Sequence, residues 1–303
     1  MKTGWLIYNG NVTHSKFTEL VDWLVKSGEE ADLKIVKVKN NELLATFEHG
    51  QAVIKGKYSQ ERPDFVIFWD KDIHLARHLE KMGLKLFNSA DAIEICDDKS
   101  LTFLKLANHG LKMPKTIHSP LMFKNPPISD DHHFDLIIEE LGLPLIMKED
   151  RGSFGAQVYM IHSREQLTEK TQELKNLGVS FLYQEYIGSS HGRDIRLNVV
   201  GDEVVATMHR VSKEDFRANV TNGGKMQTYT PTREQCEIAI ACSQIIGTDF
   251  CGVDLLFGEN DEPIVCEVNS NAHFKNIYDC TGIDVSKYMI TYILQQLEEK
   301  LPC

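Results

Sequence analysis

The chain has 303 residues, 42% hydrophobic and 25% charged, which are the proportions of an ordinary folded protein and exclude a disordered or low-complexity chain. Its 33 Lys and Arg residues against 44 Asp and Glu give a formal net charge of −11, which argues against a nucleic-acid partner. Because no apolar stretch approaches the roughly 18 residues that span a membrane and none predicts a signal peptide, we expect a cytoplasmic protein with no membrane partner.

In the first third of the chain, short apolar runs alternate with amphipathic patterns, which is typical of βαβ units around a parallel sheet. The predicted strands are Trp5–Tyr8, Leu33–Val38, Phe65–Trp69 and Leu84–Phe87. The predicted helices are Ser15–Lys26, Asp72–Lys81 and Ser100–His109. We expect the last helix to end at Gly110, because glycine is favoured just beyond a helix C-terminus.

Beyond Pro114 the sequence predicts a second region of helices and strands, which begins with an exposed loop over Pro120–Asp131. Capping boxes that begin at Ser163 and Thr232 predict two helix starts. The predicted helices are Phe134–Leu141, Ser163–Leu177, Thr232–Ile246 and Val285–Leu297. The predicted strands are Leu145–Lys148 and, as antiparallel runs, Phe181–Ile187, Ile195–Val200 and Val204–Val211.

The cysteines are odd in number and include no C-x-x-C pair, so their spacing predicts neither a disulfide framework nor a zinc site. We expect most of them to behave as small buried hydrophobic side chains. They are Cys96, Cys236, Cys242, Cys251, Cys266, Cys280 and Cys303.

The stretch GVDLLFGENDEPIVCEVNSN near the C-terminus predicts a metal-binding hairpin. A tight turn at Gly258–Asp261 joins two apolar runs. Strand alternation directs Glu267 and Asn269 to one face, and the hairpin brings Asp254 beside them. Two carboxylates and a carboxamide suit Mg²⁺, which prefers oxygen ligands. The alternative is that these side chains face solvent at the end of a strand.

A second candidate site lies in LIMKEDRGSFGAQVYMI, where an apolar strand leads to Lys148 and a loop with Gly152, Ser153 and Gly155 follows. Glycines let backbone N–H groups approach phosphate oxygens closely, and Lys148 adds a positive charge. The loop matches neither the P-loop nor the dinucleotide-binding pattern, so an ordinary hairpin turn is the better interpretation of this loop taken alone.

A third candidate site is a concentration of arginines in an otherwise acidic protein. Guanidinium groups bind carboxylate and phosphate with two parallel hydrogen bonds, so arginines on adjacent strands predict a site for an anionic substrate. Surface salt bridges are the alternative. The segment contains Arg193, Arg196, Arg210 and Arg217, with Asp194 among them, Asn219 just after Arg217 and the flexible Asn222–Gly224 at its end.

Taken in chain order, these features resemble one known family. Its motifs appear here as Lys99, Lys148 with the glycine loop, QEYI, DIR, DFRAN, and GVD followed by EVN. The order is similar to that of the RimK-type ATP-grasp ligases, the α-L-glutamate ligases, which join glutamate or a related amino acid to a carboxylate. The resemblance implies an α/β ATP-grasp fold, in which a parallel-sheet pre-ATP-grasp domain (1–95) precedes two α+β subdomains (96–187 and 188–303) that clamp ATP.

The resemblance also implies roles for individual residues. Lys99 and Lys148 would contact the ATP phosphates, and the loop of Gly152, Ser153 and Gly155 would close over them. The nucleotide would further contact Gln184, Glu185, Tyr186, Ile187, Asp194, Arg217 and Asn219. Two Mg²⁺ ions, with Mn²⁺ as an alternative, would be bound by Asp254, Glu267 and Asn269. The catalytic side chains near the acyl-phosphate and the substrate would be Arg196, Arg210 and Arg217.

The implied reaction joins a carboxylate substrate to the amine of an amino acid without a covalent bond to the protein. The carboxylate attacks the γ-phosphoryl group of ATP, and the amine then displaces phosphate from the acyl-phosphate. Such a site works by positioning and charge neutralisation, so we expect the cysteines to be replaceable. We also expect a homo-oligomer.

The resemblance weakens just after Asn269, where SNAHFKN replaces the Gly- and Pro-containing loop of the glutamate ligases. This loop is more similar to that of LysX-type ligases, which act on the C-terminal carboxylate of an amino-group carrier protein. The identity of the amino acid is therefore left open, and so is the acceptor, which is a small molecule, a peptide or a carrier protein. For His273 a packing or substrate-orienting role is favoured over that of a general base.

Two other functions compete with the ligase. A regulatory protein that binds ATP without turnover would share the fold, and a Mg²⁺-dependent nuclease would explain the carboxylates. The ligase is favoured because both lysines, the three metal-ligand candidates and the arginines are all present. A nuclease would leave Lys148 and the glycine loop without a purpose.

Overall fold

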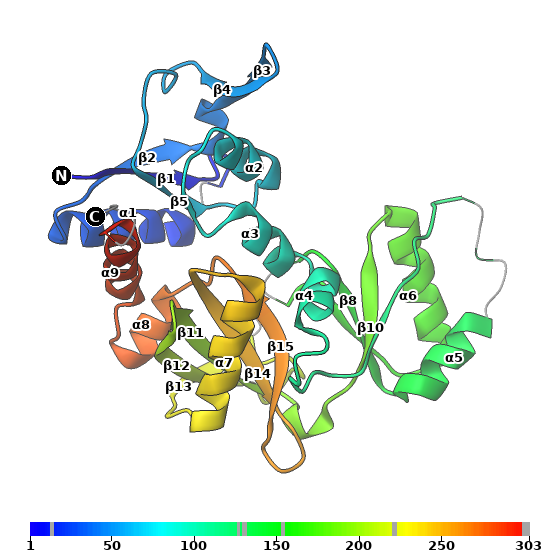
Figure 1. Cartoon of the computed structure of the whole chain (residues 1–303). Helices are drawn as coiled ribbons and strands as arrows, with labels where there is room; N and C mark the ends of the chain where they lie inside the picture. The colour runs from blue at the N-terminus through cyan, green and yellow to red at the C-terminus, as the bar shows by residue number, and fades with distance from the viewer. Residues whose placement is uncertain (13–14, 126–127, 129–131, 153–154, 220–222, 299–303) are drawn as a thin grey trace.

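The computed structural model describes residues 1–12, 15–125, 128, 132–152, 155–219 and 223–298. Helices and parallel strands alternate in the first third, antiparallel sheets with helices follow, and the predicted α/β class is confirmed. Figure 1 shows three parts, a blue N-terminal part, a green central part and a yellow to orange C-terminal part.

The N-terminal part is built on a parallel four-stranded sheet, as the sequence predicts, with the strand order β2-β1-β5-β6. Its strands are β1 (Thr3–Tyr8), β2 (Lys34–Lys39), β5 (Phe65–Trp69) and β6 (Leu86–Phe87). Its helices are α1 (Ser15–Glu30), α2 (Ile73–Lys81) and α3 (Ala90–Asp97). Leu6 and Trp5 on β1 belong to different hydrophobic cores, so both faces of the sheet are covered, as a parallel sheet requires.

Several short elements of this part escape the sequence analysis. They are α3, the 3₁₀ turn η1 (Asn40–Glu42) and the hairpin of β3 (Leu44–Glu48) with β4 (Gln51–Lys55). The hairpin strands are mostly exposed, so they lack the buried face that gives a strand its alternating pattern. The predicted strand Leu84–Phe87 is also shorter, because only Leu86 and Phe87 pair with β5.

Helix α4 (Lys99–Leu106) follows, and its predicted end at Gly110 is wrong. The helix begins at Lys99 because Asp98 accepts a hydrogen bond from the Leu101 N–H (3.0 Å) and caps it. It ends early because Ala107 is extended and Asn108 adopts a left-handed conformation with φ of 66°, which a right-handed helix does not continue through.

The central part is an antiparallel sheet with the order β7-β10-β8-β9. Its strands are β7 (Thr116–His118), β8 (Leu145–Glu149), β9 (Val158–Ile161) and β10 (Phe181–Glu185). Helices α5 (His132–Leu141) and α6 (Arg164–Leu177) pack on it. Ser163 caps α6 as predicted, but the Gln166 side chain accepts from the His162 N–H (2.8 Å) and not from Ser163, so the capping box is only half formed.

The C-terminal part is an antiparallel sheet with the order β13-β12-β11-β14-β15. Its strands are β11 (Arg193–Val200), β12 (Glu203–Val211), β13 (Lys225–Thr228), β14 (Phe250–Phe257) and β15 (Pro263–Asn269). Helix α7 (Arg233–Ile246), with the complete Thr232 and Gln235 capping box that the sequence predicts, packs on one face. The predicted antiparallel strand Phe181–Ile187 is β10 of the central sheet and ends at Glu185, and the 3₁₀ turn η2 (Gly188–Ser190) links the two sheets.

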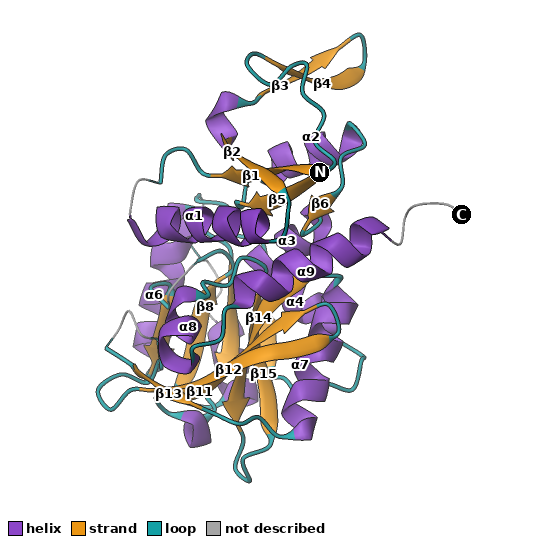
Figure 2. Ribbon diagram, turned by 90° about the vertical axis from the view of Figure 1, so that its left-hand side faces the viewer, coloured by secondary structure: helices purple, strands orange, loops and turns teal. Residues whose placement is uncertain are grey.

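Helices α8 (Lys275–Thr281) and α9 (Val285–Glu298) join the C-terminal sheet to the N-terminal part, as Figure 2 shows. The Ser27 and Ser286 hydroxyls lie 2.6 Å apart, and the Trp23 indole N–H donates to Asp284 (3.0 Å). Ile290 and Ile293 of α9 belong to the same hydrophobic core as Leu20 and Leu24 of α1. Among the described residues, no helix has the length and apolar character needed to cross a membrane.

Candidate active site

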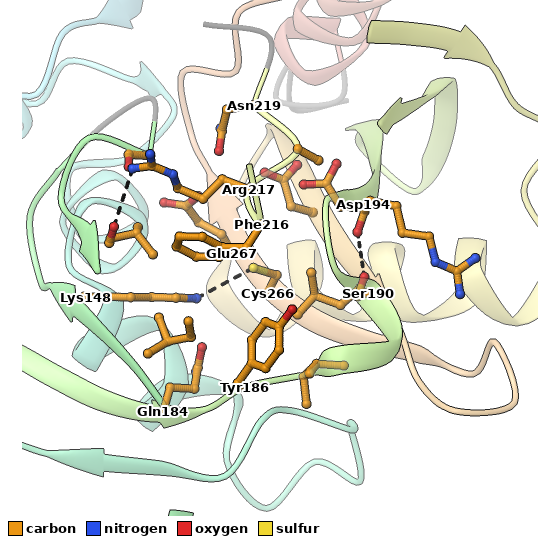
Figure 3. A pocket seen from close by; sticks show the side chains of 18 of the residues that line it. Lys148, Gln184, Tyr186, Ser190, Asp194, Phe216, Arg217, Asn219, Cys266 and Glu267 are labelled. Carbon is orange, nitrogen blue, oxygen red and sulfur yellow. Dashed lines mark hydrogen bonds between the residues drawn. The ribbon is translucent and has the colours of Figure 1, made fainter. Parts of the chain in front are cut away.

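A pocket lies between the central sheet and the C-terminal sheet, with α4 at its wall, and Figure 3 shows it from close by. Counting the space that is open to solvent, it encloses about 880 Å³. Most of the predicted site residues line it together: Lys99, Lys148, Gly152, Gly155, Gln184, Glu185, Tyr186, Ile187, Asp194, Arg210, Arg217, Asn219, Asp254 and Glu267.

Three predicted site residues stand apart from this lining. Arg196 and Asn269 lie beside it on β11 and β15 without lining it, and Ser153 lies outside the described residues. The sequence analysis also missed part of the wall, most of it apolar. Periodicity gives a signal for some of these residues, because Ile146 and Leu256 lie two positions from Lys148 and Asp254 on the same strands. The missed residues are Ile146, Gln157, Val158, Ser190, Phe216, Ala218, Leu256 and Cys266.

Two buried lysine side chains, those of Lys99 and Lys148, line the pocket. Lys99 and Lys148 are only 7% and 8% exposed. The Lys99 Nζ lies 3.6 Å from the Glu267 Oε1, and the Lys148 Nζ contacts only the Cys266 thiol, at 3.7 Å, in the described part of the chain. Figure 3 shows this contact as a dashed line across the pocket. Burying a cation without a full complement of acceptors is unfavourable, so the pair attracts an anionic ligand.

A row of charged side chains crosses neighbouring strands of the C-terminal sheet. Arg210 on β12 binds both oxygens of Asp194 (2.6 and 2.7 Å) and also reaches the Asp254 Oδ2 (2.9 Å). Arg196 binds both oxygens of Asp254 (2.7 and 2.6 Å). Burial alone would raise the pKa of Asp254, but the two guanidinium groups outweigh it and hold that pKa below its usual range. Asp254 is therefore a fixed anion.

Only two of the three predicted metal ligands stand opposite each other. Asp254 stands directly opposite Glu267 across the β14 and β15 pair, as the hairpin prediction requires, whereas Asn269 pairs with Gly252 further along. Among the described residues, no three His, Cys, Asp or Glu side chains gather as a metal site. Two adjacent carboxylates fit an oxygen-liganded Mg²⁺ whose shell is completed by phosphate and water oxygens.

Arg217 ties the glycine loop to the C-terminal sheet. Its guanidinium group donates to the Gly155 carbonyl (2.6 Å) and to both oxygens of Asp215 (2.9 and 2.7 Å). The side chain thus connects the loop after β8 with the DFRAN segment, and Asn219 lines the pocket beside it. Arg217 therefore joins the loop after β8 to the C-terminal part of the chain.

The QEYI segment forms another wall at the end of β10. The Gln184 side chain, 2% exposed, donates to the Thr116 hydroxyl (2.9 Å), and the Glu185 carboxylate accepts from the Lys115 N–H (2.6 Å). The Tyr186 hydroxyl pairs with His191. Gly192 closes this segment with φ of 63°, and a Cβ there would lie 2.4 Å from the Ser212 carbonyl, so only glycine fits.

His273 does not line the pocket, and its ring packs edge-on against Phe17 with centroids 6.3 Å apart. The six described cysteines are free thiols, and Cys303 lies outside the described residues. Burial raises the pKa of Cys242 to about 12 and that of Cys251 to about 11, so these thiols are poor nucleophiles.

Comparison with known proteins gives the following similarities. The RimK-like ATP-grasp domain profile matches residues 96–293. β-Citrylglutamate synthase B of Mus musculus is 32% identical over 278 residues, 87% of this chain and 69% of its own length. N-acetylaspartylglutamate synthase A of Homo sapiens is 33% identical over 235 residues, and these cover 76% of this chain but only 58% of that protein. A probable α-L-glutamate ligase of Citrobacter koseri is 36% identical over 220 residues, 72% of this chain and 70% of its own length.

Solved structures share the fold at low sequence identity. D-alanine–D-alanine ligase of Bacillus anthracis complexed with ATP superposes with a TM-score of 0.72 at 16% identity, covering 99% of this chain and 100% of that one. The ATP-grasp ligase PsnB complexed with minimal precursor, Mg and ADP gives a TM-score of 0.69 at 15% identity, over 97% and 98% of the two chains. The fold of the described chain is therefore that of the ATP-grasp ligases.

Proposed function

The chain belongs to the RimK-like ATP-grasp family of ATP-dependent ligases, and from this premise we propose that it joins a carboxylate to an amine through an acyl-phosphate, releasing ADP and phosphate. The observation that carries the proposal is the convergence of Lys99, Lys148 and Glu267 on one pocket from three separate segments. Two buried ammonium groups beside a carboxylate suit a nucleotide triphosphate with its metal ion.

The residues around the pocket divide the work of such a reaction. Lys99 and Lys148 hold the phosphates, and the QEYI segment of the same pocket holds the base. Arg217 holds the glycine loop down through the Gly155 carbonyl. The guanidinium groups of Arg196 and Arg210 keep Asp254 charged and lie next to the position where negative charge develops.

The pocket suits Mg²⁺ as the metal. Asp254 and Glu267, with Asn269 beside them, would bind two Mg²⁺ ions or Mn²⁺ in their place. The ions would neutralise charge on the transferred phosphoryl group. Support comes from the adjacent carboxylates and from a structural neighbour solved with Mg and ADP.

Glutamate is the amino acid we propose as the amine donor, because the products named for two relatives contain glutamate and a third is named a glutamate ligase. The carboxylate acceptor is a small molecule, a peptide or a carrier protein. A peptide is supported by the precursor bound to a structural neighbour. The active form we propose is a cytoplasmic homo-oligomer.

The test is ADP release from the full chain with ATP, Mg²⁺, L-glutamate and a panel of carboxylates. We expect ADP release that depends on both substrates and is abolished in Glu267→Ala. Glu262→Ala is the matched control, since Glu262 lies on the same hairpin and does not line the pocket. ATP binding without substrate-dependent ADP release across the panel would instead support a regulatory protein.

A further inference from the structure

The two lysines of the pocket come from different parts of the chain. Lys148 lies on β8 of the central sheet, whereas Lys99 is the first residue of α4. Helix α4 packs into the hydrophobic core of the C-terminal sheet through Leu106. If both ammonium groups are to bind one chain of phosphates, some contact must fix α4 relative to β8.

Asp150, two residues beyond Lys148, makes this contact. Its carbonyl oxygen accepts a hydrogen bond from the Lys99 N–H (3.0 Å), and its Oδ1 accepts from the Ser100 hydroxyl (2.6 Å). Its own N–H donates to the Ser180 carbonyl, directly before β10 (2.9 Å). Asp150 is therefore bonded on one side to the central sheet and on the other to the first two residues of α4.

The bonds between Asp150 and α4 lie in the interior of the protein. Asp150 is 5% exposed. The first N–H groups of a helix have no partner inside the helix, and the Asp150 carbonyl satisfies one of them here. Burial raises the pKa of Asp150, and the bond from the Ser100 hydroxyl is the largest influence that lowers it. A hydrogen bond to a buried carboxylate is costly to break, so the Ser100 bond holds α4 in place.

His118 on β7 fixes the orientation of the Ser100 hydroxyl. The His118 Nδ1 lies 3.0 Å from the Ser100 Oγ. A hydroxyl has one hydrogen, and because Asp150 accepts it, the His118 Nδ1 is the donor to Ser100. The Ser100 hydroxyl is therefore bonded to two residues of the central part, although α4 itself packs on the C-terminal sheet.

We propose that Ser100 and Asp150 are positioning residues that set Lys99 relative to Lys148, so that both ammonium groups reach the phosphates of one ATP molecule. The proposal rests on the function proposed above. A lysine has a long side chain with free rotation about its bonds, so its ammonium group is placed accurately only if its backbone is fixed. With the backbone held by Asp150, the Lys99 Nζ lies 3.6 Å from the Glu267 Oε1.

The test is the affinity of the full chain for the ATP analogue AMPPNP with Mg²⁺, measured by calorimetry. We expect Ser100→Ala to weaken binding about tenfold, because it removes the bond that holds α4 against Asp150. Asp150→Ala should have at least the same effect. Ser100→Thr keeps a hydroxyl and Asp150→Asn keeps an acceptor oxygen, so both should bind AMPPNP within about threefold of the wild type.

A double-mutant cycle separates positioning from a general structural role. If Ser100 acts through Lys99, Ser100→Ala should have no further effect in a Lys99→Met chain, whereas independent effects would add. The comparison of Ser100→Ala with Ser100→Thr decides the question if Lys99→Met binds too weakly to measure.

Ser163→Ala is the matched control, because Ser163 caps α6 on the same central sheet and does not line the pocket. It should lower stability without changing AMPPNP affinity. The proposal is overturned by unchanged affinity in Ser100→Ala, by an equal loss in Ser163→Ala or Ser100→Thr, by additive effects in the Lys99→Met chain, or by a wild type that does not bind AMPPNP.

The ligase and the positioning residues fail separately. AMPPNP affinity that depends on Ser100 as expected, without substrate-dependent ADP release, rejects the ligase and keeps the positioning residues. Substrate-dependent ADP release with an ATP KM that is unaltered in Ser100→Ala rejects the positioning residues alone.

Discussion

Two buried carboxylates of this protein, those of Asp254 and Asp70, have opposite electrostatic surroundings and opposite pKa shifts. Asp254 in the C-terminal sheet is bound by the guanidinium groups of Arg196 and Arg210, which hold its pKa low. Asp70 at the end of β5 is held only by neutral donors, and burial raises its pKa. The comparison teaches that paired guanidinium groups keep a buried carboxylate charged, whereas burial without a cation favours its protonated form.

The largest effect on stability should come from removing a guanidinium group that pairs with Asp254. Arg210→Ala leaves Asp194 and Asp254 without their shared cation in a buried environment. We expect the free energy of unfolding to fall by about 3–5 kcal/mol, measured by urea denaturation. Arg233→Ala, which removes an exposed guanidinium group paired with Glu237, is the control and should change nothing measurable. Equal stabilities of the two variants would show that the charged row is not a framework.

Arg217 links Asp215 to the glycine loop, so its replacement tests whether this link contributes to ATP binding. Arg217→Ala removes the bond to the Gly155 carbonyl but leaves no deeply buried charge behind. We expect the KM for ATP to rise about tenfold, as for one lost charge-assisted hydrogen bond, with a smaller effect on folding. Steady-state kinetics and urea denaturation measure the two effects, and unchanged KM and kcat would remove Arg217 from the site.

Asp70 gives a smaller effect with a distinctive pH dependence. Its raised pKa means that the folded chain holds this proton more tightly than the unfolded chain. The charged form therefore weakens folding, and this loss of stability develops as pH rises from the unfolded pKa of about 3.9 through the higher folded pKa.

Replacing Asp70 removes this dependence. We expect Asp70→Asn to be more stable than wild type by about 1 kcal/mol at pH 7 and to lose that advantage below about pH 4, measured by urea denaturation at both pH values. A purely structural Asp70 would give the reverse, a variant less stable at pH 7. Asp64→Asn, which makes the same charge change at the opposite end of β5, is the control.

The smallest effect should come from the thiol in the pocket. Cys266 contacts Lys148, and burial raises the pKa of Cys266 although Lys148 lowers it. Because the proposed reaction forms no bond to the protein, Cys266→Ala should retain kcat within about threefold, whereas loss of a covalent nucleophile costs orders of magnitude. An acyl group trapped on Cys266 in wild type, found by intact-mass spectrometry, would contradict this.

Sequence reasoning succeeds here where the signal is local. The Thr232 and Gln235 capping box is complete, and the short turn at Gly258–Asp261 joins β14 to β15, where a register shift between Asp254 and Leu255 brings Asp254 opposite Glu267. The capping box and the hairpin each form between residues that are close together in the chain. The end of α4 was predictable from the same class of signal, but the left-handed Asn108 precedes the expected Gly110.

The rest depends on pairings between distant segments, which periodicity does not encode. Arg196 meets Asp254 because β11 lies beside β14, 58 residues apart in sequence. Asp70 meets Asn9 across 61 residues and Asn271 across 201. Nothing in the local pattern around Asp70 distinguishes it from an ordinary polar residue at the end of a strand.

The most direct test of the proposed ligase uses a carboxylate substrate labelled with ¹⁸O, incubated with the full chain, ATP, Mg²⁺ and the amino acid. If the carboxylate attacks the γ-phosphoryl group and the amine then displaces phosphate, one labelled oxygen moves into the inorganic phosphate. Mass spectrometry of that phosphate should show one ¹⁸O for each amide bond formed. Amide formation with unlabelled phosphate would contradict an acyl-phosphate route.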